Sequence, residues 1–192
     1  GGSLPPALFL TMITCLLSGM LLPTAATYSL VATLVAPALV TLGVSLLSAH
    51  LFVLYSAMLS SITPPVALAA YAAASISNAN PLTIAVLACK FGMAAFAVPY
   101  FFVYDPAILG IDVTWFQMAI SFVSAILGGI CASAAMLGYF TDKLNILDRL
   151  LFAVIAFLFM NSDWRIDFAA LALLLALVWW VKPRPIGHQK LE

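Results

Sequence analysis

The sequence has no charged side chain before Lys90. An uncharged stretch of this length lacks the charged surface that a soluble domain needs, and its apolar runs approach the roughly 20 residues that a helix needs to cross a bilayer. Over the whole chain, 65% of the residues are hydrophobic, 7% are charged and the mean hydropathy is +1.17. Alternating strands typical of a membrane barrel are missing. The sequence therefore predicts an all-α integral membrane protein.

The charge balance and the cysteines exclude other classes. A net charge of zero gives no support for binding to nucleic acid. The cysteines at positions 15, 89 and 131 lie in apolar runs without metal-ligand spacing, so we interpret them as packing residues. The chain starts without Met and without a charged leader, and we expect it to be a piece of a longer polypeptide.

Residues 1–43 predict a re-entrant hairpin. Two apolar runs of about 15 residues each, 8–22 and 29–42, flank the stretch SGMLLPTAAT, and each is marginal for a full crossing at about 1.5 Å per residue. A non-helical tip at membrane depth survives only where it is buried in protein or lines a wet cavity.

Residues 44–74 predict a broken transmembrane helix, because the apolar run contains Thr63-Pro64-Pro65. Proline has no N–H, so the carbonyls of Ser60 and Ser61 are expected to be free. Thr63 is a suitable N-cap and Pro64 a suitable first helical residue, so a half-helix is expected to start there, with its positive dipole end at mid-membrane. The break would then offer carbonyls to a cation and N–H groups to an anion.

The hairpin tip repeats this chemistry. Gly19 is expected in the left-handed conformation that ends a helix, and Pro23 is expected to open the next one. The carbonyls of residues 18–22 would then be free, with the hydroxyls of Thr24 and Thr27 nearby. One hairpin tip plus one broken helix is the arrangement of ion-coupled secondary transporters. The alternative is a proline kink that neighbouring helices satisfy, as in a structural or channel-like helical subunit with no transport site.

The rest of the chain predicts about four further membrane helices. Residues 75–110 contain the polar turn SISNANP, a span over 82–104 and an outer loop. Residues 111–192 contain helices over 115–140, 146–160 and 168–181 and a basic cytoplasmic tail, although the number of crossings after residue 141 stays open. Lys143, Arg149 and the tail place the loop after residue 140 in the cytoplasm by the positive-inside rule. The hairpin then enters from the outer surface.

Two stretches carry a resemblance to a known family. GMLLPTAATYSLVATLVAPAL and the later YSAMLSSITPPVALAAYAAAS resemble the C-terminal half of the large membrane subunit of TRAP transporters, specifically the TAXI-type fused permeases. The similar region covers residues 19–109. The resemblance implies the second half of an inverted-repeat elevator transporter, which imports small organic acids (carboxylates) by Na⁺-coupled symport across a bacterial or archaeal inner membrane.

The resemblance also implies partners and site residues. The partners are an extracytoplasmic solute-binding protein, the N-terminal half of the permease, a small membrane subunit or domain, and the membrane lipid. The second hairpin tip would consist of Ser18, Gly19, Met20, Pro23 and Thr24, and the matching break of Ser61, Thr63, Pro64 and Pro65. The implied Na⁺ ligands are Ser18, Gly19, Ser60, Ser61 and Thr63, and the implied substrate-binding residues are Thr24, Thr27, Thr63, Pro64 and Pro65. The tip departs from the family pattern, because Leu21 replaces a second glycine and Ala25 replaces a second threonine.

Four polar residues elsewhere have alternative interpretations. His50 is expected to make a structural hydrogen bond rather than relay protons. Lys90 lies deep in its predicted span, so it is either functional or reaches the cytoplasmic face. Asp105 and Asp112 are expected to be solvated loop charges, with contact to a binding protein as the alternative.

An intramembrane enzyme is the main rival function. Ser18 and His50 could be imagined as a nucleophile and its base, but no nucleophile-turn motif surrounds Ser18. We therefore expect no catalytic residues.

Overall fold

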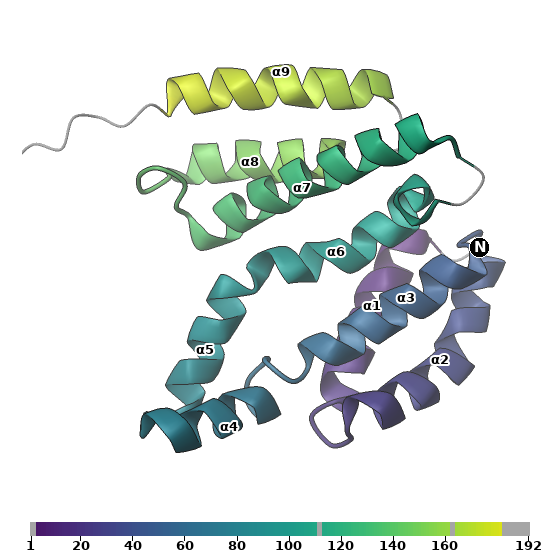
Figure 1. Cartoon of the computed structure of the whole chain (residues 1–192), viewed down its shortest axis with the longest axis vertical. Helices are drawn as coiled ribbons and strands as arrows, with labels where there is room; N and C mark the ends of the chain where they lie inside the picture. The colour runs from purple at the N-terminus through teal and green to yellow at the C-terminus, as the bar shows by residue number, and fades with distance from the viewer. Residues whose placement is uncertain (1–2, 111–112, 162–163, 182–192) are drawn as a thin grey trace, which may run out of the picture.

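The computed structural model describes residues 3–110, 113–161 and 164–181, and these are helical almost throughout. Figure 1 shows their arrangement. The elements in chain order are α1 (Leu4–Ser18), α2 (Thr24–Thr41), α3 (Leu46–Leu59), α4 (Leu68–Ser77), α5 (Pro81–Phe91), α6 (Met93–Tyr104), the 3₁₀ helix η1 (Pro106–Leu109), α7 (Trp115–Leu137), α8 (Ile146–Leu158) and α9 (Trp164–Trp180). The prediction of an all-α membrane protein is confirmed.

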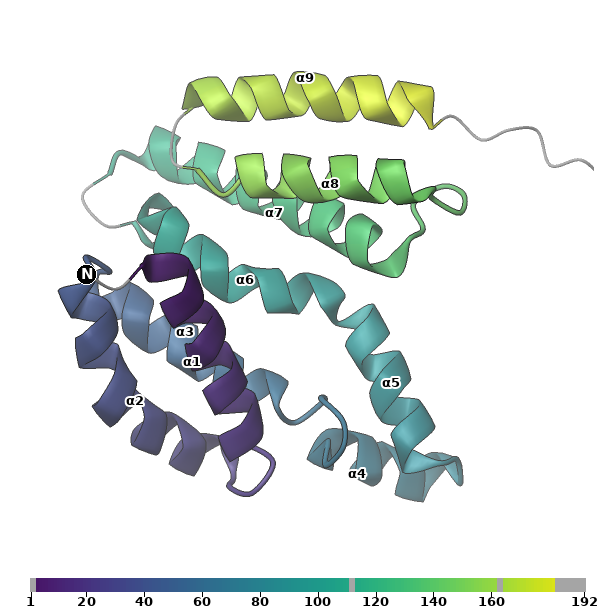
Figure 2. The ribbon, with the colours of Figure 1, turned by 180° about the vertical axis from the view of Figure 1, so that it is seen from behind.

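The first three helices form a hairpin packed on a third helix. The helices α1 and α2 are the two arms, α3 lies against both, and α1 crosses in front of α3 when the molecule is seen from behind (Figure 2). The core between them contains mainly Leu, Phe and Ala side chains, including Leu8, Leu39 and Phe52. The hairpin predicted for residues 1–43 is present, and its second arm is three residues longer than its first.

The predicted broken helix is also present, with a longer break than expected. The helix α3 ends at Leu59 and α4 begins at Leu68. The second part runs to Ser77 rather than residue 74. The helices α4 and α5 meet at an angle of 119° and stand apart from the other helices (Figure 1).

The span predicted over residues 82–104 is divided in two at Gly92. The Gly92 backbone has φ −84° and ψ 9°, so α5 ends at Phe91 and α6 begins at Met93. A Cβ on Gly92 would lie 3.1 Å from Ile62 Cδ1, so the joint lies close against the break segment. The prediction of one continuous helix is therefore wrong at this residue.

The helix α6 is shared by two cores. Phe96 and Tyr100 pack against the α1–α3 core, and the Tyr100 ring meets Phe52 edge-on at 5.3 Å between centroids. Phe101, the next residue, belongs to the core of α7, α8 and α9. A Cβ on Gly128 of α7 would lie 2.5 Å from Phe101 Cζ, so the glycine allows α6 and α7 to approach closely.

The helices α7, α8 and α9 form one layer at the other side of α6 (Figures 1 and 2). The helix α7 starts with a capping box, in which Thr114 and Gln117 hold each other's backbone N–H groups. It ends at Gly138 with a φ of +69°, where the guanidinium of Arg149 donates to the carbonyls of Ala135 and Met136. The three predicted C-terminal helices are present, and α9 starts four residues earlier than expected.

By length and hydropathy alone, α2 and α7 can cross a membrane, and the bent α4–α5 pair raises the number to three within the described residues. The remaining apolar helices are shorter. Asp112 and the basic tail from residue 182 lie outside the described residues, so the expectations for them stay predictions.

Candidate functional site

The hairpin tip and the end of α3 touch at Gly19. A Cβ built on Gly19 would overlap both Cβ and Oγ of Ser60 and would lie 3.1 Å from the carbonyl oxygen of Cys15. Ser60 is 3% exposed. The sequence predicts a left-handed Gly19, but its φ is −72°. Glycine is therefore needed here for space, and it brings the two breaks in the chain into direct contact.

The free carbonyls of the tip differ from the predicted set. The Ser18 carbonyl accepts hydrogen bonds from the N–H groups of Leu21 and Leu22, and the Leu22 carbonyl accepts one from Thr27 Oγ1 at 3.3 Å. The carbonyls of residues 19–21 accept no hydrogen bond from any described residue. The prediction is thus wrong at both ends of the tip, and three consecutive carbonyls remain as acceptors.

The break segment is closed by a hydrogen bond that the sequence did not predict. The Ser60 carbonyl accepts from the N–H of Thr63 at 3.2 Å, and the Ser61 carbonyl accepts from the N–H of Ala69 at 3.0 Å. The expectation that the two proline residues leave both carbonyls free is therefore wrong. The bond from Ala69 to Ser61 joins the first turn of α4 to the end of α3 across the break.

The second half-helix starts later than predicted. Thr63 is not its N-cap and Pro64 is not its first residue, because α4 begins at Leu68 after Ala67. Ala67 has a φ of 35° and is the residue at which the chain enters α4. Its side chain is buried and packs against Ala85 of α5. The prolines belong to the irregular segment before this turn, where Pro64 is half-buried and Pro65 is exposed.

The hydroxyl groups at the two breaks share one geometry. Each donates its proton to a main-chain carbonyl, which leaves the lone pairs of the hydroxyl oxygen available to an electrophile or a cation. Ser60 Oγ donates to Ala57 at 2.7 Å and Thr63 Oγ1 donates to Leu59 at 2.6 Å. The other two are Ser61 Oγ, which donates to Met58, and the fully buried Thr27 Oγ1. Thr24 is the first residue of α2, beside the tip.

Two contacts of the break segment were missed by sequence reasoning. Cys89 Sγ of α5 lies 3.2 Å from the Ile62 carbonyl oxygen, and Gly92 packs against the Ile62 side chain. The prediction treats Cys89 as an ordinary packing residue, and the sequence gives no local signal that would pair it with residue 62. The α5–α6 joint therefore packs against the break segment at Ile62.

Three further polar residues are now placed. Tyr28 OH lies 3.0 Å from His50 Nδ1, which supports the structural interpretation of His50. Lys90 is exposed in the last turn of α5. Asp105 is 3% exposed, so its interpretation as a solvated loop charge is wrong.

The part of the chain that contains the hairpin tip and the broken helix matches a known family. The family model of the tripartite ATP-independent periplasmic transporter, DctM component, matches residues 2–113, more than half of the chain. The chain belongs to the DctM family. The matched region contains the hairpin, both halves of the broken helix and α6, and it ends after η1. No curated protein and no solved structure matches the chain significantly.

Membership of the DctM family confirms the prediction of a TRAP large membrane subunit. The family is one of secondary transporter permeases, and it implies a solute-binding protein and a small membrane subunit as partners. The TAXI-type fused architecture stays a prediction.

Proposed function

We propose that this chain is the C-terminal part of a permease that imports small organic acids, with Na⁺ as the coupling ion, into a bacterial or archaeal cell across the inner membrane. The observation that supports the proposal is the contact between Gly19 and Ser60, because it brings the tip that carries the free carbonyls next to the hydroxyl-bearing end of α3. A TAXI-type fused permease fits this description.

The donor set at this contact fits an alkali cation. Hard cations bind carbonyl, hydroxyl and carboxylate oxygens, and the two breaks supply the first two kinds. The carbonyls of residues 19–21 and the hydroxyl oxygens of Ser60, Ser61 and Thr63 would hold Na⁺, with Ser18 at the base of the tip. When bound, the ion would supply a positive charge next to the break and thereby favour an anionic substrate.

The start of α4 offers fewer free N–H groups to an anion than the sequence predicts. Of its first three amide groups, those of Ala69 and Ala70 donate to Ser61 and Ala67, while the N–H of Leu68 has no acceptor among the described residues. No Lys or Arg precedes residue 90. A carboxylate would therefore be held by this amide, by the hydroxyls of Thr24, Thr27 and Thr63, and by the segment shaped by Pro64 and Pro65, together with the upstream half of the permease.

The test is uptake by the complete permease with its small subunit and its binding protein, reconstituted in liposomes. A panel of radiolabelled small organic acids is supplied with and without an inward Na⁺ gradient. We expect Na⁺-dependent uptake of at least one acid. Thr63→Val, which removes the hydroxyl and keeps the shape, is expected to raise the Na⁺ concentration for half-maximal uptake by about tenfold, the equivalent of one lost charge-assisted contact.

Thr14→Val is the matched control. The Thr14 hydroxyl also donates to a carbonyl four residues earlier, at 2.8 Å, but it lies on the exposed side of α1. This variant is expected to keep the wild-type Na⁺ dependence. Equal Na⁺ dependence in the wild type and both variants would remove Thr63 from the ion site, and uptake without any Na⁺ requirement would refute the coupling ion itself.

A further inference from the structure

Arg149 of α8 lies against the end of α7 and keeps one edge of its guanidinium group free. Its Nε donates to the Ala135 carbonyl at 2.8 Å, and its Nη2 donates to the Met136 carbonyl at 3.1 Å. These bonds use the edge formed by Nε and Nη2. The edge formed by Nη1 and Nη2 has no acceptor among the described residues. This free edge can hold a phosphate by two parallel hydrogen bonds.

The nearby acidic residues do not neutralise Arg149 by ion pairing. Asp142 Oδ1 accepts the main-chain N–H of Lys143, and Asp148 Oδ2 accepts that of Asn145. Within the described part of the chain, neither carboxylate forms an ion pair with Arg149 or Lys143. Both basic side chains are exposed, and the positive-inside rule places this end of the layer at the cytoplasmic surface. Arg149 can therefore pair with an anion there.

An apolar groove begins at Arg149. A cavity of about 460 Å³ between α8, α6 and the end of α7 has Arg149 in its wall, and its other described lining residues are apolar. It shares Met93 of α6 and Met136 of α7 with a second cavity of about 670 Å³. Both volumes lie in the range of about 300–1,000 Å³ for ligand sites. The two cavities adjoin, so we treat them as one groove.

The groove follows one face of α8. Arg149, Ala153 and Phe157 follow one another at intervals of four residues and lie on the same side of the helix. The distance from Arg149 to Phe157 is about 12 Å at about 1.5 Å per residue, close to the ~15 Å of one leaflet of the hydrocarbon core. Phe9 and Met12 of α1 form the opposite wall. Figure 2 shows α1 and α8 on the same face of the molecule, with α6 between them.

The lining of the groove suits a flexible apolar chain. The second cavity is lined by Met12, Met93, Met136 and Met160, and methionine side chains adapt their shape to irregular apolar partners. Met136 and Phe157 are 50% and 61% exposed, so the groove is open at its surface. A small soluble anion would leave this apolar surface uncovered, whereas a phospholipid covers it and also supplies a phosphate to Arg149.

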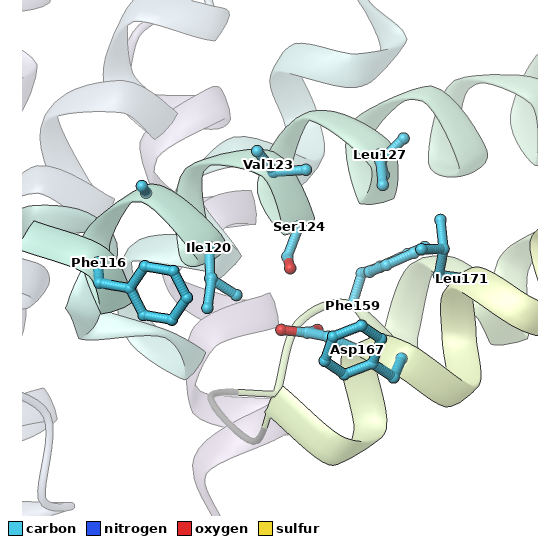
Figure 3. Close-up of a pocket in the computed structure, with 10 residues that line it drawn as sticks. Phe116, Ile120, Val123, Ser124, Leu127, Phe159, Asp167 and Leu171 are labelled. Atoms are coloured by element: carbon cyan, nitrogen blue, oxygen red, sulfur yellow. The ribbon is translucent and has the colours of Figure 1, made fainter.

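The other cavity of the layer has no basic side chain in its described lining. It measures about 280 Å³ and lies between α7 and the start of α9 (Figure 3). Its wall is apolar apart from Ser124 and Asp167. An anionic headgroup would find no cation there, so this cavity provides a control position for a site that depends on Arg149.

We propose that the groove binds an anionic phospholipid of the cytoplasmic leaflet. Its phosphate accepts two hydrogen bonds from the free edge of Arg149, the exposed Lys143 adds positive charge, and one acyl chain lies between α1 and α8. The lipid thereby contacts both the region that the family model matches and the layer after it. This site goes beyond the proposed transport function and does not depend on the contact between Gly19 and Ser60.

The experiment titrates the complete permease, purified in detergent, with palmitoyl-oleoyl phosphatidylglycerol and measures bound lipid by native mass spectrometry. We expect saturable binding that is about tenfold tighter than that of phosphatidylcholine with the same chains. Glycerophosphate, which carries the phosphate without the chains, is expected not to compete. Arg149→Gln removes the charge and the paired donors. It should weaken binding of phosphatidylglycerol by about tenfold and leave that of phosphatidylcholine nearly unchanged.

Two further variants locate the site. Ala153→Phe fills the groove and leaves the hydrogen bonds from Arg149 to α7 in place, so it tests the site even where Arg149→Gln folds poorly. It is expected to weaken phosphatidylglycerol binding at least as much as Arg149→Gln does. Ala119→Phe makes the same replacement in the cavity of Figure 3 and is expected to leave binding unchanged.

Four results would each overturn the proposal. They are equal affinity for the two lipids, unchanged phosphatidylglycerol binding in Arg149→Gln or Ala153→Phe, an equal loss of binding in Ala119→Phe and Ala153→Phe, and effective competition by glycerophosphate. The last result would assign Arg149 to a soluble phosphate compound instead of a lipid.

Discussion

Adding a single methyl group at the hairpin tip tests the contact on which the proposed site depends. In Gly19→Ala the new Cβ would overlap the Ser60 side chain, which is almost completely buried and cannot move into solvent. The Ser60 hydroxyl is also held by its 2.7 Å hydrogen bond to the Ala57 carbonyl. We therefore expect Gly19→Ala to destabilise the folded permease.

The magnitude follows from three contributions. Overpacking in a well-packed core costs about 1–3 kcal/mol, and turning the Ser60 hydroxyl away loses a hydrogen bond worth about 1 kcal/mol. Replacing glycine by alanine lowers the conformational entropy of the unfolded chain, which stabilises the folded state by about 0.4–1 kcal/mol. The expected net loss is about 1–3.5 kcal/mol. In a Ser60→Gly background the side chain that clashes with the new methyl group is absent, so Gly19→Ala should leave the free energy of unfolding nearly unchanged.

The assay is reversible unfolding of the purified permease in mixed micelles, with the four members of the double-mutant cycle measured side by side. We expect a coupling free energy of about 2 kcal/mol between positions 19 and 60, within the range for residues in contact. Gly129→Ala in α7 is the control, because nothing lies within 4 Å of its added methyl group. A coupling near zero, or the same loss in Gly129→Ala as in Gly19→Ala, would refute the close approach of tip and break.

Three other predictions follow from the packing. Arg149→Lys should lower the free energy of unfolding by about 1–2 kcal/mol in the same assay, because a lysine cannot replace the two-pronged donation to the last turn of α7. Gly128→Ala should destabilise by about 1–3 kcal/mol through its clash with the α6 ring, whereas Gly129→Ala should not. Cys89 should react with a small maleimide before the other two cysteines, which are fully buried, and mass spectrometry of the labelled permease checks the order.

The positions of the breaks could be predicted because their causes are local. Two adjacent prolines remove two successive donors wherever they occur, so the interruption near Pro64 follows from the residues themselves. The same holds for Pro23, after which α2 begins, and for the capping box at Thr114, where a threonine precedes a glutamine by three residues. Apolar periodicity and length were enough for the helices of the C-terminal layer.

The geometry inside the breaks could not be predicted, because it depends on partners distant in the sequence. A glycine in a turn suggests a positive φ, yet Gly19 and Gly92 both have a negative φ. Gly19 leaves space for Ser60, and Gly92 lies close to Ile62. The bond from Ala69 to Ser61 likewise spans an irregular segment whose path no local rule specifies. These contacts decide which carbonyls remain available, so the predicted ligand set needed correction at the tip and at the break.

The sharing of α6 between two cores limits how the chain can be dissected. The family match ends at residue 113, and a fragment cut there looks like a natural expression unit. Such a fragment would carry Phe101 without the α7–α9 layer that covers it, and the complementary fragment would lack one wall of its own core. Two fragments cut at residue 113 should therefore each be unstable alone, because each lacks part of the packing around α6. When they are co-expressed, they should be stable only as a complex. The C-terminal layer thus stabilises the region that the family model matches. Its deletion should destabilise that region, and a loss of transport in such a deletion would not show that the layer takes part in transport.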